Sequence, residues 1–272
     1  MTRLSLFNVV SLTFGFVFLY VPMLILVIYS FNKSKLVTVW AGFSTKWYSE
    51  LLANDAFLDA AWVTVKVAVL SSSIATVLGT MAAYVLVRGG RFFGRTLFSG
   101  MIYAPLVMPE VITGLSLLLL FIGMGLDRGV LTIVLAHTTF SMCFVSVVVS
   151  SRLMTFDNSL EEAALDLGAP PLDAFRLVTL PIIAPAVISG WLLAFTLSLD
   201  DLVIASFTSG PSATTLPMKI WSSVRLGVSP EINALSTILI TMVTIGVVAA
   251  SLASKQAALR AKRDEQKAAR MT

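Results

Sequence analysis

Three acidic residues lie within long apolar stretches of this 272-residue sequence, where a carboxylate has little water around it. Glu110 lies near the middle of one stretch and follows Pro109, whose missing N–H loosens a helix at that point. Asp200 and Asp201 lie in the outer part of another stretch. An ionised group at mid-bilayer costs about 2.5–3.5 kcal/mol on insertion scales, so it usually faces a polar path or a partner. These three acids are therefore candidate residues of a path through a membrane.

Adjacent residues of a helix point about 100° apart, so only one of Asp200 and Asp201 is expected to face such a path. Two structural alternatives remain open. In the first, one of these aspartates pairs with Lys66, which lies at a similar depth in its own apolar stretch. In the second, Asp201 lies at the membrane interface and is solvated there.

Other kinds of chemistry find little support in the sequence. The single cysteine, Cys143, allows no disulfide within the chain, and with the single histidine, His137, it leaves no metal-binding cluster. Both are expected to be packing residues, as are the methionines of the apolar stretches. The segment Gly89–Thr96 resembles a P-loop, but Arg95 replaces the lysine and an apolar helix precedes the glycines instead of a strand. We therefore expect no catalytic site, metal, cofactor or nucleic acid.

The composition identifies an integral membrane protein. Hydrophobic residues make up 57% of the chain and charged residues only 12%, against about 25% charged residues in soluble domains. The mean hydropathy is +0.90. The longest segments outside the apolar stretches are too short for an ordinary folded domain of at least about 50 residues. The chain therefore has no room for a nucleotide-binding domain, and any energy source must come from another subunit.

The charged residues divide the sequence into six expected membrane helices, and the stretches are too long for the roughly 10-residue strands of a membrane barrel. Twelve of the 19 Lys and Arg residues fall in the two ends and alternate connections, against six on the other side. This asymmetry predicts cytoplasmic termini for an all-α protein. The expected helices cover residues 6–29, 59–87, 96–126, 129–151, 185–207 and 232–254.

The cytoplasmic connection 151–184 carries five acids and only two bases. A short helix is expected to begin at Asn158 or Ser159 and to end at Gly168, with acids in its first turn. A second helix is expected to open at Pro171, and Pro181 and Pro185 mark entry to the fifth membrane helix. The first helix also has an apolar stripe that comprises Ala163, Ala164 and Leu167. This organisation predicts a surface that docks a partner.

The same connection resembles the EAA loop of the permease subunits of bacterial ABC importers. The resemblance lies in Glu162-Ala163-Ala164, then Gly168, then Val178-x-Leu180-Pro181, with Val178 where the family usually has isoleucine. It implies the type I importer permease fold, with coupling helices that dock on a cytoplasmic ATPase and no enzyme activity in this chain. The coupling residues it implies are Glu162, Ala163, Ala164, Gly168, Leu180 and Pro181.

Three longer segments, residues 27–48, 104–121 and 189–217, are similar to permeases of putrescine/spermidine importers, most closely to the putrescine type. This resemblance implies ATP-driven import of a polyamine, such as putrescine, across the bacterial inner membrane. The carboxylates at 110, 200 and 201 would then replace part of the hydration of a diamine. The implied partners are a second, homologous permease subunit, two copies of the ATPase and a periplasmic polyamine-binding protein.

Three aromatic residues in the first external connection, Trp40, Trp47 and Tyr48, are candidate cation contacts or members of an interfacial aromatic belt. Residues 1–58 would form the first helix and this connection, and residues 59–254 the five-helix core. The tail 255–272 would be a basic helix near lipid headgroups. The alternatives are a permease for spermidine or another cation, or an autonomous proton-coupled transporter that titrates Glu110 or Asp200.

Overall fold

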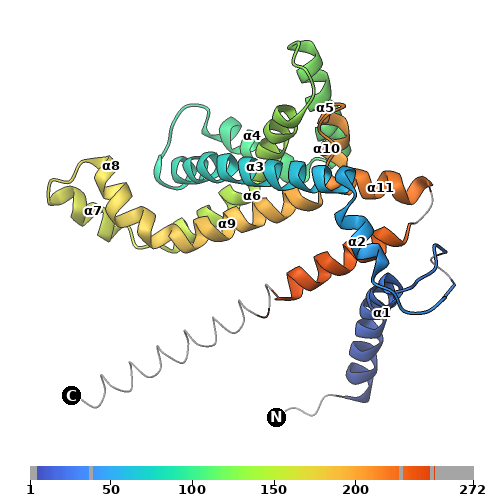
Figure 1. Cartoon of the computed structure of the whole chain (residues 1–272). Coiled ribbons are helices and arrows are strands. Elements are labelled where there is room, and N and C mark those ends of the chain that lie inside the picture. The colour runs from blue at the N-terminus through green and yellow to red at the C-terminus, as the bar shows by residue number, and fades with distance from the viewer. Residues whose placement is uncertain (1–4, 37–38, 227–228, 246–247, 249–272) are drawn as a thin grey trace. The chain divides into compact units, whose positions relative to one another are not determined.

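The computed structural model describes residues 5–36, 39–226, 229–245 and 248, and almost all of them are helical (Figure 1). One antiparallel bridge, Asn32 with Phe43, is the β-pairing found within these residues. The helices, in chain order, are α1 Leu6–Ser30, α2 Lys46–Leu52, α3 Asp55–Arg88, α4 Arg95–Val107, α5 Glu110–Gly123, α6 Val130–Thr155, α7 Ser159–Asp166, α8 Pro171–Ala174, the π-helical turn η1 Phe175–Thr179, α9 Leu180–Asp200, α10 Val203–Thr208 and α11 Leu216–Leu226. A further apolar helix covers Pro230–Ile245.

Four helical segments of the described chain are long and apolar enough to cross a membrane: α1, α3, α6 and the continuous run Pro171–Asp200. The pair α4 and α5 forms a fifth candidate, although it is sharply bent. Pro230–Ile245 begins the sixth expected membrane helix, and the end of that helix and the tail 255–272 lie outside the described residues. The all-helical class is thus confirmed, and the count of six and the cytoplasmic termini remain predictions.

The third expected membrane helix is broken in two. The axes of α4 and α5 differ by 117°. A residue that precedes proline is pushed out of the helical region, and Met108 is accordingly extended, with ψ of 135°. Pro109 is extended as well, and its carbonyl accepts the N–H groups of Ile112 and Thr113 as α5 begins. The sequence predicted a helix loosened at Pro109 within residues 96–126, and the structure shows two helices there, because Pro109 ends the first and starts the second.

The described chain falls into two compact units: residues 56–222, and residues 1–55 with 223–272. In the first unit, small residues bring long helices together. A Cβ added to Gly79 of α3 would lie 2.7 Å from the Met142 carbonyl oxygen of α6, and one added to Gly190 of α9 would lie 3.2 Å from Val145. Such close approach is typical of membrane helix pairs. The core around this contact contains Ala83, Val145, Val149, Leu153, Ile183 and Ala194.

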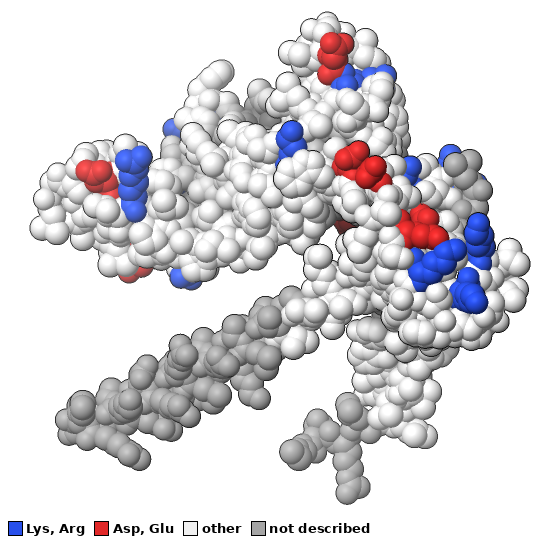
Figure 2. Space-filling model, viewed as in Figure 1, with Lys and Arg blue, Asp and Glu red and all other residues white. Residues whose placement is uncertain are grey.

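In the other unit, α1 is an apolar helix with no charged residue and with little of its surface buried. It is accordingly white in Figure 2, where charged residues are coloured. The connection that follows is organised by Asn32, which is 1% exposed. Its side-chain amide donates to the Val39 carbonyl over 2.7 Å, and its side-chain oxygen accepts the Ala41 N–H. The described parts of this unit also include Asn54, which donates to Glu231 over 3.3 Å.

Candidate functional site

The segment between α6 and α9 forms a compact helical projection, which we call the coupling segment (residues 157–181). The Asp157 carboxylate accepts the Ser159 N–H at the start of α7, and this hydrogen bond holds the Asp157 pKa below its usual range. Asn158 is the N-cap residue, as expected, but its side chain makes no capping hydrogen bond, and Asp157 supplies the side-chain acceptor instead. Gly168 ends α7 as expected, with a φ of +88° that favours glycine.

Glu161 anchors α7 to the rest of its unit. Its side chain is 14% exposed and accepts hydrogen bonds from the Tyr84 hydroxyl over 2.6 Å and from the Thr179 hydroxyl over 3.0 Å. The Arg88 guanidinium lies 3.7 Å from the same carboxylate and 5.4 Å from the centre of the Phe156 ring. One carboxylate thus joins α7 to the end of α3 and to η1. The sequence showed Glu161 in the first turn but gave no sign of these distant partners.

The opposite side of the coupling segment is open. Glu162, Ala163, Gly168 and Pro181 are exposed, and Ala164 and Leu180 are half-buried. Three leucines of the same segment are also exposed: Leu165 is 41% exposed, Leu172 60% and Leu167 90%. Figure 2 also shows acidic and basic side chains on the surface at the left, where α7 and α8 lie in Figure 1. An exposed surface that mixes leucines with charges is typical of a contact with another protein.

The fifth membrane helix starts earlier than expected. Residues Pro171–Asp200 form one continuous helical run, with the π-helical turn η1 in its first part. Pro181 was expected to mark a separate entry to this helix. It lies inside this run, directly after η1, and the wider π-helical turn makes room for its ring. The part of the coupling segment from Pro171 onward is therefore continuous with α9.

The three candidate path acids occupy two breaks in membrane helices. Glu110 is the first residue of α5, directly after the bend at Pro109, and it is exposed. Asp200 is the last residue of α9 and is exposed as well. Asp201 follows in extended conformation and caps α10, because its carboxylate accepts the N–H groups of Ile204 at 3.3 Å and Ala205 at 2.7 Å.

Asp201 is also held by His137, which the sequence had suggested was only a packing residue. His137 is 2% exposed, its Nε2 lies 3.0 Å from the Asp201 carboxylate, and its Nδ1 lies 2.6 Å from the Ser198 hydroxyl. The Ser71 hydroxyl donates to Ser198 in turn. This chain of hydrogen bonds links α3, α6 and the end of α9. A buried histidine requires such partners, but its sequence position did not identify them.

Lys66 is exposed on α3 and forms no ion pair with an aspartate among the described residues. The alternative in which Asp200 or Asp201 pairs with Lys66 is therefore not what the structure shows. His137 is the partner of Asp201 instead.

The three aromatic residues expected in the first external connection differ in their environments. Trp47 is 3% exposed and donates from its indole to the Asn32 carbonyl over 2.6 Å. The Tyr48 hydroxyl lies 2.6 Å from the Ser30 hydroxyl. Trp40 is 47% exposed and meets Tyr29 edge to face. Trp40 thus has the most accessible ring of the three, and a role for any of them in cation contact remains a prediction.

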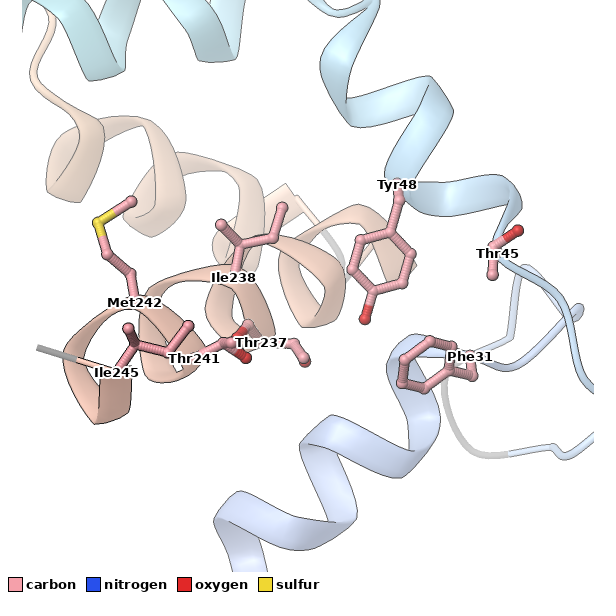
Figure 3. A pocket seen from close by; sticks show the side chains of 8 residues that line it. All are labelled: Phe31, Thr45, Tyr48, Thr237, Ile238, Thr241, Met242 and Ile245. Carbon is pink, nitrogen blue, oxygen red and sulfur yellow. Dashed lines mark hydrogen bonds between the residues drawn. The ribbon is translucent and has the colours of Figure 1, made fainter. Parts of the chain in front are cut away.

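Tyr48 also lines a groove of about 670 Å³ within its unit (Figure 3). Phe31 lies beside it, and the helix Pro230–Ile245 forms the other wall. The hydroxyls of Thr237 and Thr241 in that wall donate to carbonyls of their own helix, so the groove presents mainly apolar groups. None of the residues that line it is acidic.

The fold is that of an ABC importer permease. A bacterial ABC transporter involved in the import of the acidic polysaccharide alginate has a chain that superimposes with a TM-score of 0.71, at 16% identity, over 93% of this chain and 98% of its own. Residues 75–262 match a protein family that is described as "binding-protein-dependent transport system inner membrane component". This chain belongs to that family, and it is a multi-pass protein of the inner membrane.

Two relatives have polyamines in their names. The putrescine transport system permease protein PotI of Escherichia coli K12 is 63% identical over 247 residues, which cover 89% of this chain and 88% of the relative. The spermidine/putrescine transport system permease protein PotC of the same strain is 44% identical, over 88% of this chain and 90% of the relative.

Proposed function

We propose that this chain is a permease subunit of an importer for putrescine, in which a separate ATPase supplies the free energy. The observation that carries the proposal is the 63% identity to a putrescine permease over most of both chains. The relative named for both spermidine and putrescine is more distant, at 44% identity, which favours the shorter diamine.

The path residues of this proposal are Glu110, Asp200 and Asp201. Putrescine carries two ammonium groups, and carboxylates along the path offset part of the cost of removing their hydration. The exposed carboxylates of Glu110 and Asp200 lie at helix breaks, as is typical of binding sites in membrane transporters. Asp201 contributes to the path mainly by fixing the local structure, because its carboxylate is already bound by His137 and by the first N–H groups of α10.

The coupling residues are Glu162, Ala163, Ala164, Gly168, Leu180 and Pro181. The exposed leucines around α7 supply apolar area for the ATPase, and Glu162 supplies a charge. Closure of the two ATPase copies would push the coupling segment, and the continuous run Pro171–Asp200 would carry that displacement toward Asp200. Alternating access to the path would follow from this motion. The chain's other partners would be a second, homologous permease subunit and a periplasmic polyamine-binding protein.

The proposal is tested by purifying the chain with its associated subunits in lipid nanodiscs and measuring ATP hydrolysis. Putrescine, spermidine and lysine are each added with the polyamine-binding protein. We expect putrescine to stimulate hydrolysis most strongly and lysine to have no effect. Equal stimulation by putrescine and spermidine would overturn the assignment to putrescine, and stimulation by neither would overturn the polyamine class.

A further inference from the structure

A pocket of about 370 Å³ with polar groups in a mainly apolar lining opens between α3, α4 and α6, at the end of these helices from which the coupling segment leaves. None of the proposed path or coupling residues lines it. Its walls include Leu86 and Met154, whereas its polar groups come from α4 and α6. The helices are fixed around it by a buried cluster of Ala82, Leu86 and Ile102, with Tyr103 packed against it.

The polar groups converge from two sides. Arg95, Ser99 and Tyr103 follow one another at intervals of four residues and so form a stripe along α4. Across the pocket, Ser150 of α6 is 5% exposed, and its hydroxyl has no hydrogen-bond partner among the described residues. A buried hydroxyl without a partner costs free energy, so this group favours a ligand that fills the pocket.

Arg95 brings a positive charge to the lining of the pocket. Its guanidinium donates from Nη2 to the Leu86 carbonyl over 2.7 Å, and this hydrogen bond holds the guanidinium in place. No acidic side chain forms an ion pair with Arg95 in the described part of the chain. Gly94, with φ of +83°, starts α4 without a side-chain cap. The N–H groups of Thr96 and Leu97 in the first turn therefore lack partners within their helix.

An arginine, hydroxyls and a helix N-terminus together recognise a phosphate group. The apolar walls and the neighbouring surface indicate which phosphate it is. Leu97 and Met101 on α4 are 69% and 66% exposed, and Phe93 just before α4 is fully exposed, as expected for side chains that face lipid. We propose that this pocket binds the headgroup phosphate of an anionic phospholipid, with its acyl chains along α4. The glycine-rich turn that resembles a P-loop would thus bind a lipid phosphate, not a nucleotide.

The experiment measures lipid binding to the delipidated, purified transporter by native mass spectrometry. Phosphatidylglycerol and phosphatidylcholine are titrated separately, and inorganic phosphate is added as a competitor. We expect phosphatidylglycerol to bind more tightly than phosphatidylcholine, and Arg95→Gln to weaken its binding about fivefold, as for the loss of one basic contact at a lipid headgroup. Arg95→Lys should retain most of the affinity, and Ser150→Val should reduce it by removing the buried hydroxyl.

Arg152→Gln is the matched control, because Arg152 lies on α6 two residues beyond Ser150, is exposed and does not line the pocket. Its binding curve should equal that of the wild type, and thermal unfolding should show that each variant is folded. Equal effects of Arg95→Gln and Arg152→Gln, or equal binding of the two lipids, would overturn the site. Displacement of phosphatidylglycerol by millimolar inorganic phosphate would overturn its assignment to a lipid. No transport is measured, so the result is independent of the proposed solute.

Discussion

Two regions of the described chain each contain a pair of adjacent acids, and in both pairs the members have different environments. In the coupling segment, Glu161 is 14% exposed and has three partners, whereas Glu162 is exposed. At the end of α9, Asp201 is 8% exposed and is bound by His137 and the start of α10, whereas Asp200 is exposed. In each pair, one acid stabilises the local structure and the other is free to meet a partner or a solute.

The largest difference is expected between Asp201→Ala and Asp200→Ala. Removal of Asp201 leaves His137 buried without its partner and α10 without its cap, so the free energy of unfolding should fall by about 3 kcal/mol. Asp200→Ala should change it by less than about 0.5 kcal/mol, as is typical of exposed sites. Denaturant unfolding in detergent micelles measures both. Equal losses for the two variants would contradict the division of roles between these aspartates.

The next comparison is between Glu161→Gln and Glu162→Gln. Glu161→Gln removes the charge that Arg88 faces and weakens the acceptor for Tyr84 and Thr179, so we expect the free energy of unfolding to fall by about 2–3 kcal/mol. Hydrogen exchange of the α7 amides should accelerate in this variant. Glu162→Gln is the matched control on the same helix and should leave exchange unchanged. If both variants exchange alike, Glu161 does not anchor α7.

Charge changes on the open side of the coupling segment should separate ATP hydrolysis from uptake. Glu162→Lys reverses a charge at the proposed ATPase contact, and Gly168→Asp adds a side chain where φ is positive. We expect putrescine taken up per ATP to fall by about tenfold or more, as for a reversed charge in an interface, with normal amounts of protein in the membrane. Wild-type uptake in both variants would remove the docking role.

Neutral amides at the exposed path acids should weaken transport without loss of stability. Glu110→Gln and Asp200→Asn should each raise the KM for putrescine about tenfold, the factor for loss of one hydrogen bond to a charged group. Asp127→Asn, between α5 and α6, is a control outside the proposed path. Uptake kinetics in proteoliposomes provide the measurement. An unchanged KM in both path variants would show that these carboxylates are structural.

The smallest effect is expected for Thr179→Val, which removes one of the hydroxyls that donate to Glu161 at nearly constant volume. The free energy of unfolding should fall by about 1 kcal/mol. Thr155→Val is the matched control, because the Thr155 hydroxyl bonds only to carbonyls of its own helix. A loss as large as that of Glu161→Gln would place the anchor at Thr179 instead of Glu161.

Local sequence signals predicted much of the coupling segment. Gly168 ends α7 and Pro171 opens the following helix, because a positive φ and a missing N–H are properties of single residues. Pro181 was expected to mark the entry to the fifth membrane helix, because proline usually begins or interrupts a helix. Proline tolerates a helix interior when a π-helical turn makes room, and no property of Pro181 itself announces that turn.

The partners of the buried acids could not be predicted, because they come from distant parts of the chain. Tyr84 lies 77 residues from Glu161, and His137 lies 64 residues from Asp201. The sequence shows that the two acids of each pair are adjacent and so point in different directions on a helix. It does not show which of the two is buried. That choice depends on which side of α7 or α9 faces the other helices, and packing decides it.

Uptake of labelled putrescine into proteoliposomes tests the central proposal most directly. The assembled transporter is reconstituted with the binding protein outside and the ATPases facing the lumen, and is compared with this chain alone under a proton gradient. We predict uptake by the assembly only when ATP is inside, and none by the chain alone. Uptake by the chain alone, driven by protons, would contradict the account and identify an autonomous transporter.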